Sequence, residues 1–169
     1  MTLDDFTGFS GRVLDHDWSF LGWKDVLHVM SSRHPYARFY GPNGWLPHDR
    51  WELRRCAVVE QRPKSPRRFY GSKIYFWDGQ TYETAMVLVF DRDGALWKVI
   101  DLVHGWSEDA SQPEEDRGRH LPRNLGFTIV DVHRRQATIF SAYKMAYPDA
   151  DPSEVEQLYD LNRLNEGRR

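Results

Sequence analysis

The seven histidines are the first residues to consider for chemistry in this sequence of 169 residues. His104, His120 and His133 are separated by steps of 16 and 13 residues. No pair shows the His-x-x-x-His or Glu-x-x-His spacing that puts two metal ligands on one helix face. With a single cysteine, Cys56, neither an internal disulfide nor a cysteine-built zinc site can form. The sequence therefore predicts no metal site and no cofactor.

Local pairs of an acid and an imidazole could still supply a general base near neutral pH. Asp101 with His104 is one such pair, and His16 between two aspartates is another. Solvated loop histidines show the same pattern, and Cys56 lies in a strand-like run where a thiol is usually inert. The sequence contains no Gly-x-Ser-x-Gly motif. We expect a protein that is not an enzyme, and keep an enzyme using Asp101 and His104 as a third hypothesis.

Charge and hydropathy exclude other classes of function. The formal net charge of −2 and a pI of about 6.4 argue against nucleic acid, which needs a strongly basic face. The longest uncharged apolar run, residues 84–90, is far shorter than the roughly 20 residues that a membrane-spanning helix needs. The first six residues hold two acids and no apolar stretch, so no signal peptide is expected and a cytoplasmic location stays open.

One segment, residues 50–68, is basic, with seven Lys or Arg against two Glu. Arg54 and Arg55 in it are candidate contacts for an anionic lipid headgroup. An acidic partner, nucleic acid or simply a basic strand side in water would fit this segment as well.

Short β segments separated by turn residues dominate the chain after residue 50. The expected strands are residues 51–60, 69–77, 82–90, 95–104, 125–132 and 137–144. A short helix is expected at 23–30, within a loop-rich cover formed by residues 1–49. A second helix is expected at 151–166, because Asp151-Pro-Ser-Glu154 is an N-terminal capping pattern followed by an apolar stripe. We expect one domain, with the sheet at 50–145.

Two turn sequences allow a register to be predicted. Asp78-Gly-Gln-Thr81 and Asp91-Arg-Asp-Gly94 each resemble a four-residue hairpin connection. The residues that would then face each other are Trp77 with Tyr82, Tyr75 with Thr84, Lys73 with Met86, Phe90 with Ala95, Leu88 with Trp97, and Met86 with Val99.

This register predicts a sheet that is apolar on both faces. The first face would carry Tyr75, Trp77, Tyr82, Met86, Leu88, Phe90, Trp97 and Val99. The second would carry Ile74, Phe76, Ala85, Val87, Val89, Leu96 and Ile100. An antiparallel sheet with one wet face should be polar on that face, so both faces need cover from a helix, a second layer or an apolar ligand. The aromatic first face is the predicted ligand lining.

Several motifs resemble a known bacterial family. They are Trp18-Ser-Phe-Leu-Gly22, Arg50-Trp-Glu-Leu-Arg54, Lys73-Ile-Tyr-Phe76 and Phe90-Asp-Arg-Asp-Gly-Ala-Leu-Trp-Lys-Val99. In order and spacing they are similar to the C-terminal part of a family of unknown function described as outer-membrane lipoprotein-sorting proteins. The similarity spans roughly residues 5–145. Its members are secreted and more than twice this length, so the chain is expected to be a fragment of that longer architecture or a reduced member.

The resemblance implies a fold similar to the periplasmic lipoprotein carrier LolA and its mycobacterial relative LppX, a strongly curved antiparallel sheet forming an unclosed half-barrel. It also implies a periplasmic location and a lipid-exporting transporter as partner. Combined with the residues, it predicts a β-dominated α+β domain that carries a lipid or another long apolar ligand in the hollow of the sheet. The alternative is a protein-interaction module, such as a homodimer, that buries the apolar face.

Overall fold

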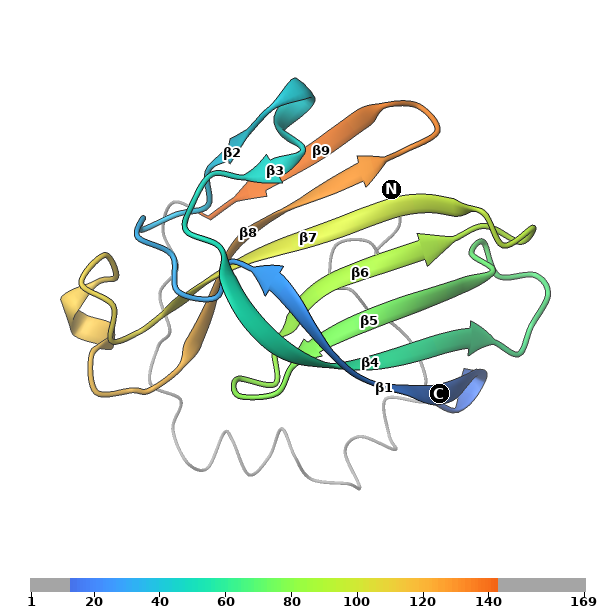
Figure 1. Cartoon of the computed structure of the whole chain (residues 1–169), viewed down its shortest axis with the longest axis horizontal. Helices are drawn as coiled ribbons and strands as arrows, with labels where there is room; N and C mark the ends of the chain where they lie inside the picture. Colours follow the sequence, from blue (N-terminus) through green and yellow to red (C-terminus); the bar gives the residue numbers. More distant parts are fainter. Residues whose placement is uncertain (1–12, 143–169) are drawn as a thin grey trace, which may run out of the picture.

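The computed structural model describes residues 13–142 of the chain. Seven antiparallel strands form one curved sheet in the order β1-β4-β5-β6-β7-β8-β9 (Figure 1). The strands are β1 (His16–His28), β4 (Glu52–Pro63), β5 (Ser72–Asp78), β6 (Thr84–Phe90), β7 (Leu96–Trp106), β8 (Pro122–Asp131) and β9 (Gln136–Ser141). Within the described residues β1 and β9 are the two edges and do not pair, so the sheet is not closed.

A second, two-stranded sheet lies between β1 and β4 in sequence. It pairs β2 (Phe39–Tyr40) with β3 (Leu46–Pro47). The helical segments of residues 13–142 are three short 3-10 turns, η1 (Val13–Asp15), η2 (Pro42–Gly44) and η3 (Glu114–Asp116). The prediction of a β-dominated fold with a large open antiparallel sheet is therefore confirmed, and all six predicted strands are present.

The predicted helix at residues 23–30 is wrong, because most of this segment belongs to β1, which pairs with β4 along its whole length. Gly22 explains the error. It has a φ of 114° and lies where β1 shifts register against β4. This irregularity interrupts the alternation of side chains between Phe20 and Trp23, so the period of two is lost in the sequence. The predicted helix at 151–166 lies outside the described residues.

The predicted register of the β5–β6 hairpin is also wrong, because Tyr75 lies opposite Val87 instead of Thr84. The connection closes two residues later than expected, with Trp77 opposite Thr84 instead of Tyr82 and the Asp78 amide donating to the Glu83 carbonyl. A register shift between Phe76 and Trp77 then adds one more residue. A one-residue slip exchanges the faces of every residue beyond it.

The β6–β7 connection is a hairpin as predicted, with Gly94 in the left-handed region at a φ of 82°. Its register differs by two residues, because Leu88 lies opposite Val99 and not Trp97. A shift of two keeps the side of each side chain, so Leu88 and Val99 share a face as expected. Trp97, next to another register shift, packs against the opposite face.

One face of the sheet forms the main buried cluster. It consists of Tyr70, Tyr75, Val87, Val89, Ile100, Leu102, Phe127 and Ile129, with Trp18, Trp77 and Trp97 packed against it. Fully burying a side chain of this size contributes about 1.5–3 kcal/mol, so this cluster is a dominant source of stability.

The opposite face is covered at its β7–β9 end by residues 29–51. A second cluster joins Val29 and Ala37 of that segment to Val103 of β7 and Leu125 of β8. The Thr128 hydroxyl donates to the Gly44 carbonyl at 3.2 Å, which fixes the segment over β8. Residues 29–51 therefore cover part of this face, whereas residues 16–28, which were assigned to the loop-rich cover 1–49, are part of the sheet.

Candidate functional site

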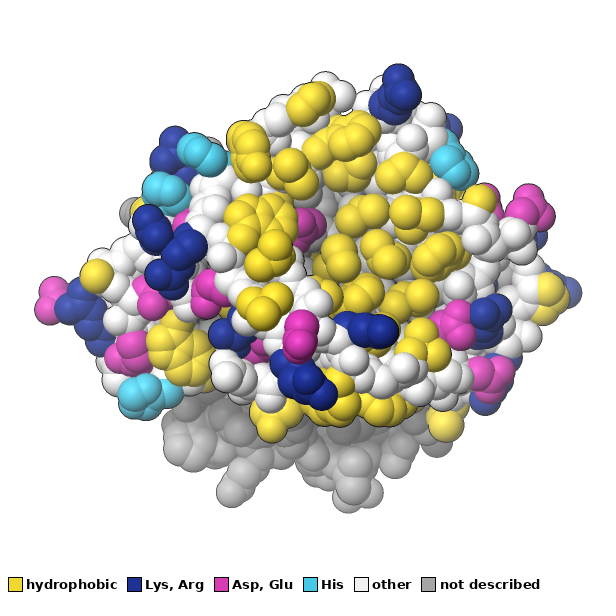
Figure 2. All heavy atoms as spheres, viewed as in Figure 1, with side chains coloured by type: hydrophobic (Ala, Val, Ile, Leu, Met, Phe, Trp, Pro, Cys, Tyr) yellow, Lys and Arg dark blue, Asp and Glu magenta, His cyan; other side chains and the backbone are white. Residues whose placement is uncertain are grey.

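The uncovered part of this second face is an apolar hollow. Cross-strand pairing places its side chains in rows over β5, β6 and β7, with Ile74 opposite Leu88 and Leu88 opposite Val99 in one row. Phe76 opposite Met86 forms the next row. We call the half-buried set the apolar hollow, and it consists of Ile74, Phe76, Met86, Leu88, Phe90 and Val99. Figure 2 shows apolar side chains gathered in a recess at this place.

The strands explain why the hollow is apolar and only half-buried. β6 reads Thr-Ala-Met-Val-Leu-Val-Phe, and its burial alternates between half-buried and buried residues along the whole strand. The buried ones, such as Val87, belong to the main cluster on the other face, and the half-buried ones, such as Leu88, line the hollow. A strand that is apolar on both sides is expected where both faces are shielded from water.

The observed register places the predicted lining residues on different faces of the sheet. Met86, Leu88, Phe90 and Val99 do lie together on the hollow face. The aromatic members do not join them: Tyr75, Trp77 and Trp97 belong to the buried cluster of the other face. Tyr82 lies in the β5–β6 connection and is 84% exposed. Ile74 and Phe76, which were assigned to the second face, complete the hollow instead.

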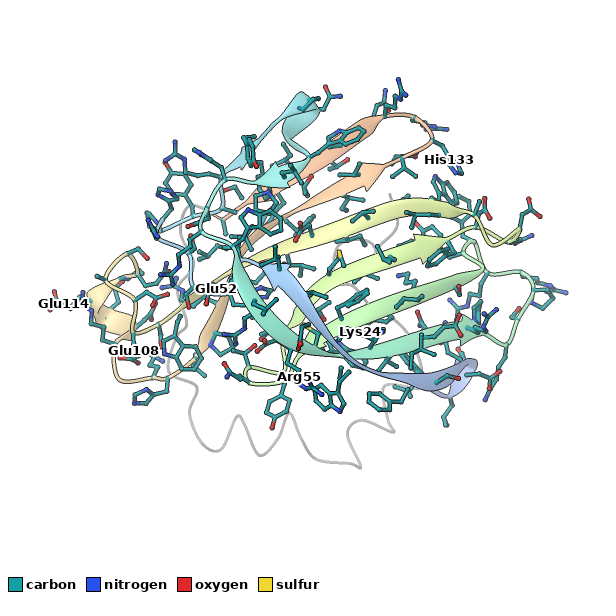
Figure 3. The ribbon with its side chains drawn as sticks, in the orientation of Figure 1. Lys24, Glu52, Arg55, Glu108, Glu114 and His133 are labelled. Carbon is teal, nitrogen blue, oxygen red and sulfur yellow. The ribbon has the colours of Figure 1, made fainter. Side chains whose placement is uncertain are left out.

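The two predicted headgroup contacts, Arg54 and Arg55, alternate along β4 and therefore point to opposite faces. Arg54 donates to both carboxylate oxygens of Asp78, at 2.8 and 2.9 Å, so its charge is already paired. Arg55 is largely exposed and lies over the Trp23 ring, 5.8 Å from its centroid. Figure 3 shows Arg55 at the lower margin of the sheet, whereas Lys24 lies over the front of the hollow.

A polar cluster closes the hollow at the end where β1 and β7 approach each other. Asp101 lies opposite Met86 and so faces the hollow. Its Oδ1 atom lies 3.2 Å from Nδ1 of His28, the last residue of β1. The His28 and His104 rings are 6.2 Å apart, and Nε2 of His104 lies 3.7 Å from Oε2 of Glu83. The suggested Asp101–His104 pair is therefore replaced by Asp101 with His28.

Sequence reasoning missed His28 because it lies in the segment assigned to a helix. The alternation of Trp23, Asp25 and Leu27 on one side of β1 was the signal that could have found it. A strand ending at residue 28 leaves His28 opposite Glu52 of β4.

Burial shifts the ionisation of this cluster. Burial lowers the pKa of His104, an effect that Glu83 only partly opposes, so the imidazole is neutral near pH 7.

Burial raises the pKa of the Cys56 thiol to about 11. This thiol is buried and protonated, which agrees with the expectation that Cys56 is an inert core residue.

The Asp78 carboxylate behaves differently from its neighbours. Burial alone would raise its pKa, but hydrogen bonds from Arg54 and from the amide and hydroxyl of Thr81 outweigh burial and lower the pKa to about 2. The side chain therefore stays ionised and closes the β5–β6 connection.

Within residues 13–142 no group of three or more His, Cys, Asp or Glu side chains could hold a metal ion. No helix in the same part of the chain is long and apolar enough to cross a bilayer.

Comparisons with known proteins agree with the family resemblance. The model of a family described as protein of unknown function (DUF1329) matches residues 1–162. A crystal structure of a domain described as an outer membrane lipoprotein-sorting protein, from Vibrio parahaemolyticus, superposes with a TM-score of 0.51 at 15% identity. The superposition covers 88% of this chain and 49% of that one, so this chain spans about half the length of the structure it matches. No curated protein matches the sequence.

Proposed function

This chain belongs to the DUF1329 family of proteins of unknown function, and we propose that it binds and carries a lipid or another long apolar molecule in the apolar hollow. The observation that carries this proposal is the pair of apolar rows on β5, β6 and β7 that residues 29–51 leave uncovered. Folded proteins rarely leave a contiguous apolar recess unused, and each Å² of apolar surface buried there contributes about 25 cal/mol.

The proposed role is non-enzymatic, and the fold similarity supports it. The matched Vibrio domain is described as lipoprotein-sorting, a task that requires holding acyl chains away from water. A periplasmic location and a lipid-exporting transporter as partner belong to the same proposal.

The test compares binding of a fluorescent apolar probe, N-phenyl-1-naphthylamine, by the protein and two variants. Leu88→Asp puts a carboxylate in the middle of a row of the hollow, and we expect it to weaken probe binding at least about tenfold, because a buried unpaired charge is costly. The matched control is Leu53→Asp, the same change at a side chain 70% exposed on the other face of β4.

Circular dichroism should show that both variants keep the fold. Probe binding that survives Leu88→Asp unchanged, or falls equally in Leu53→Asp, would contradict the proposed use of the hollow.

A second candidate function, a protein-interaction surface, is supported by exposed apolar side chains on the outer side of β1 and β4. Phe20, Trp23, Leu27 and Leu53 share that side, and each is between 48% and 70% exposed. Light scattering coupled to size exclusion separates the two functions, because a tight dimer without probe binding would favour the interaction surface.

A further inference from the structure

The polar end of the apolar hollow is an unusual place for ionisable groups. Asp101 is the carboxylate of β7 on the hollow face, and its side chain is only 11% exposed. Beside it, His28 and His104 are almost completely buried. Desolvating such groups is unfavourable unless hydrogen bonds replace the water.

Several of these atoms lack that replacement. Among the described residues, Oδ1 of Asp101, Nε2 of His28 and both ring nitrogens of His104 have no hydrogen-bond partner. The 3.2 Å approach of His28 Nδ1 to Asp101 Oδ1 is within ion-pair reach but lacks hydrogen-bond alignment. Each orphaned buried group costs about 1–3 kcal/mol, so a ligand that pairs with them would recover part of that cost.

The charged side chains around this end determine which headgroup charge is unfavourable. Among the described residues, Asp101, Glu52, Asp78 and Glu83 place four carboxylates around this end, and Arg54 adds one guanidinium. Arg54 is occupied by Asp78. An anionic headgroup would therefore meet repulsion here.

Burial and hydrogen-bonding capacity distinguish an ammonium headgroup from a hydroxyl headgroup. An ammonium group offers only donors and loses much hydration on entering a buried site. A hydroxyl donates one hydrogen bond and accepts others, so it can pair with the Asp101 carboxylate and also accept from an imidazole N–H.

Resting on the proposed function, we infer that the hollow takes its ligand with a hydroxyl group at the Asp101–His28 end, so that the preferred ligand is a long-chain alcohol or another apolar molecule that ends in a hydroxyl. Asp101 accepts a hydrogen bond from the ligand hydroxyl, and the His28 ring lies beside the carboxylate. The apolar chain then lies along Met86 and Leu88 toward Phe90.

The experiment measures displacement of N-phenyl-1-naphthylamine at pH 8 by three probes of equal chain length, 1-dodecanol, dodecanoate and dodecylamine. We expect dodecanol to displace the dye at about tenfold lower concentration than either charged probe. Dodecanoate or dodecylamine matching or exceeding dodecanol would overturn the inference.

Asp101→Asn tests the residue itself. It removes the charge but keeps the shape, and we expect it to abolish the preference for dodecanol. The control is Asp93→Asn in the exposed β6–β7 turn, which should keep the preference. A preference that persists in a folded Asp101→Asn protein would overturn the assignment, and if that variant does not fold, the ranking of probes on the unmodified protein still decides.

The outcomes separate this inference from the proposed function. If no probe displaces the dye and the dye itself does not bind, the proposed function fails. If all three probes displace the dye equally, the hollow binds the alkyl chains without distinguishing their headgroups. If dodecanoate is preferred and Lys24→Gln removes that preference, the headgroup lies at Lys24, at the front of the hollow in Figure 3, and the inference is wrong.

Discussion

Asp78 shows how one side chain can set the geometry of several others. Its carboxylate accepts hydrogen bonds from Arg54 of β4 and from the amides of Gln80 and Thr81 in the next connection. It thereby ties β4 to the β5–β6 hairpin, next to the polar end of the hollow. A carboxylate satisfied by several donors is costly to remove, because the donors are left buried without an acceptor.

We predict that Asp78→Asn lowers the free energy of unfolding by about 2–3 kcal/mol at pH 7. Because the pKa of Asp78 falls from 3.8 to about 2 on folding, its contribution is present above pH 3.8 and is lost as the pH falls through about 2. Urea titrations of both proteins at a series of pH values check this, and the difference between them should shrink on acidification.

A control for this substitution is Asp25→Asn, which removes a largely exposed partner of Arg55 and should change stability by less than about 0.5 kcal/mol. Equal losses for the two variants would show that Asp78 has no special role.

At the scale of the elements, the strands could be predicted from the sequence, but their exact pairing could not. Turn residues and apolar runs located all six predicted strands. The residues of the β5–β6 hairpin were assigned to the wrong faces because of a single register shift between Phe76 and Trp77, which no residue type predicts. A positive φ of 61° at Tyr82, instead of at Gly79, likewise cannot be read from composition.

Gly79 has a different purpose, which only the folded chain reveals. A Cβ there would lie 3.0 Å from both the Arg55 carbonyl and the Trp23 ring. Glycine therefore suits this position because neighbouring atoms approach the backbone closely, and not because the backbone is left-handed. β1 was missed for a similar local reason, the glycine irregularity at Gly22.

Gly126 of β8 lies where this strand meets β9 and the covering segment. We predict that Gly126→Ala destabilises the sheet by about 2–3 kcal/mol. Its φ is 153°, and a Cβ would run into the Phe140 carbonyl of β9 and the Cβ of Ala37 in the covering segment. Gly118→Ala is the matched control, because Gly118 also has a positive φ, 85°, but a Cβ there would meet no atom of the described residues within 4 Å. It should cost only about 1 kcal/mol, and chemical denaturation with equal losses would contradict the packing argument.

At the scale of the whole molecule, the sequence predicted a sheet that is apolar on both faces. One face carries the buried cluster of Tyr75 and its neighbours, and the other is divided between the part under residues 29–51 and the apolar hollow. The face of each predicted lining residue could be read from the sequence only in part: Met86, Leu88, Phe90 and Val99 share the hollow face, whereas Tyr75, Trp77 and Trp97 lie on the other. The Asp101–His28 pair joins strands far apart in sequence, so spacing alone could not predict it.

We assign ligand binding to the apolar hollow and not to the exposed outer side of β1 and β4. Photo-crosslinking with a twelve-carbon alcohol that carries a diazirine in mid-chain, followed by peptide mass spectrometry, distinguishes them. We predict labelling of Phe76, Met86 and Leu88 that excess unlabelled dodecanol suppresses. Labelling confined to Phe20, Trp23 and Leu53, or labelling that dodecanol does not compete, would contradict it.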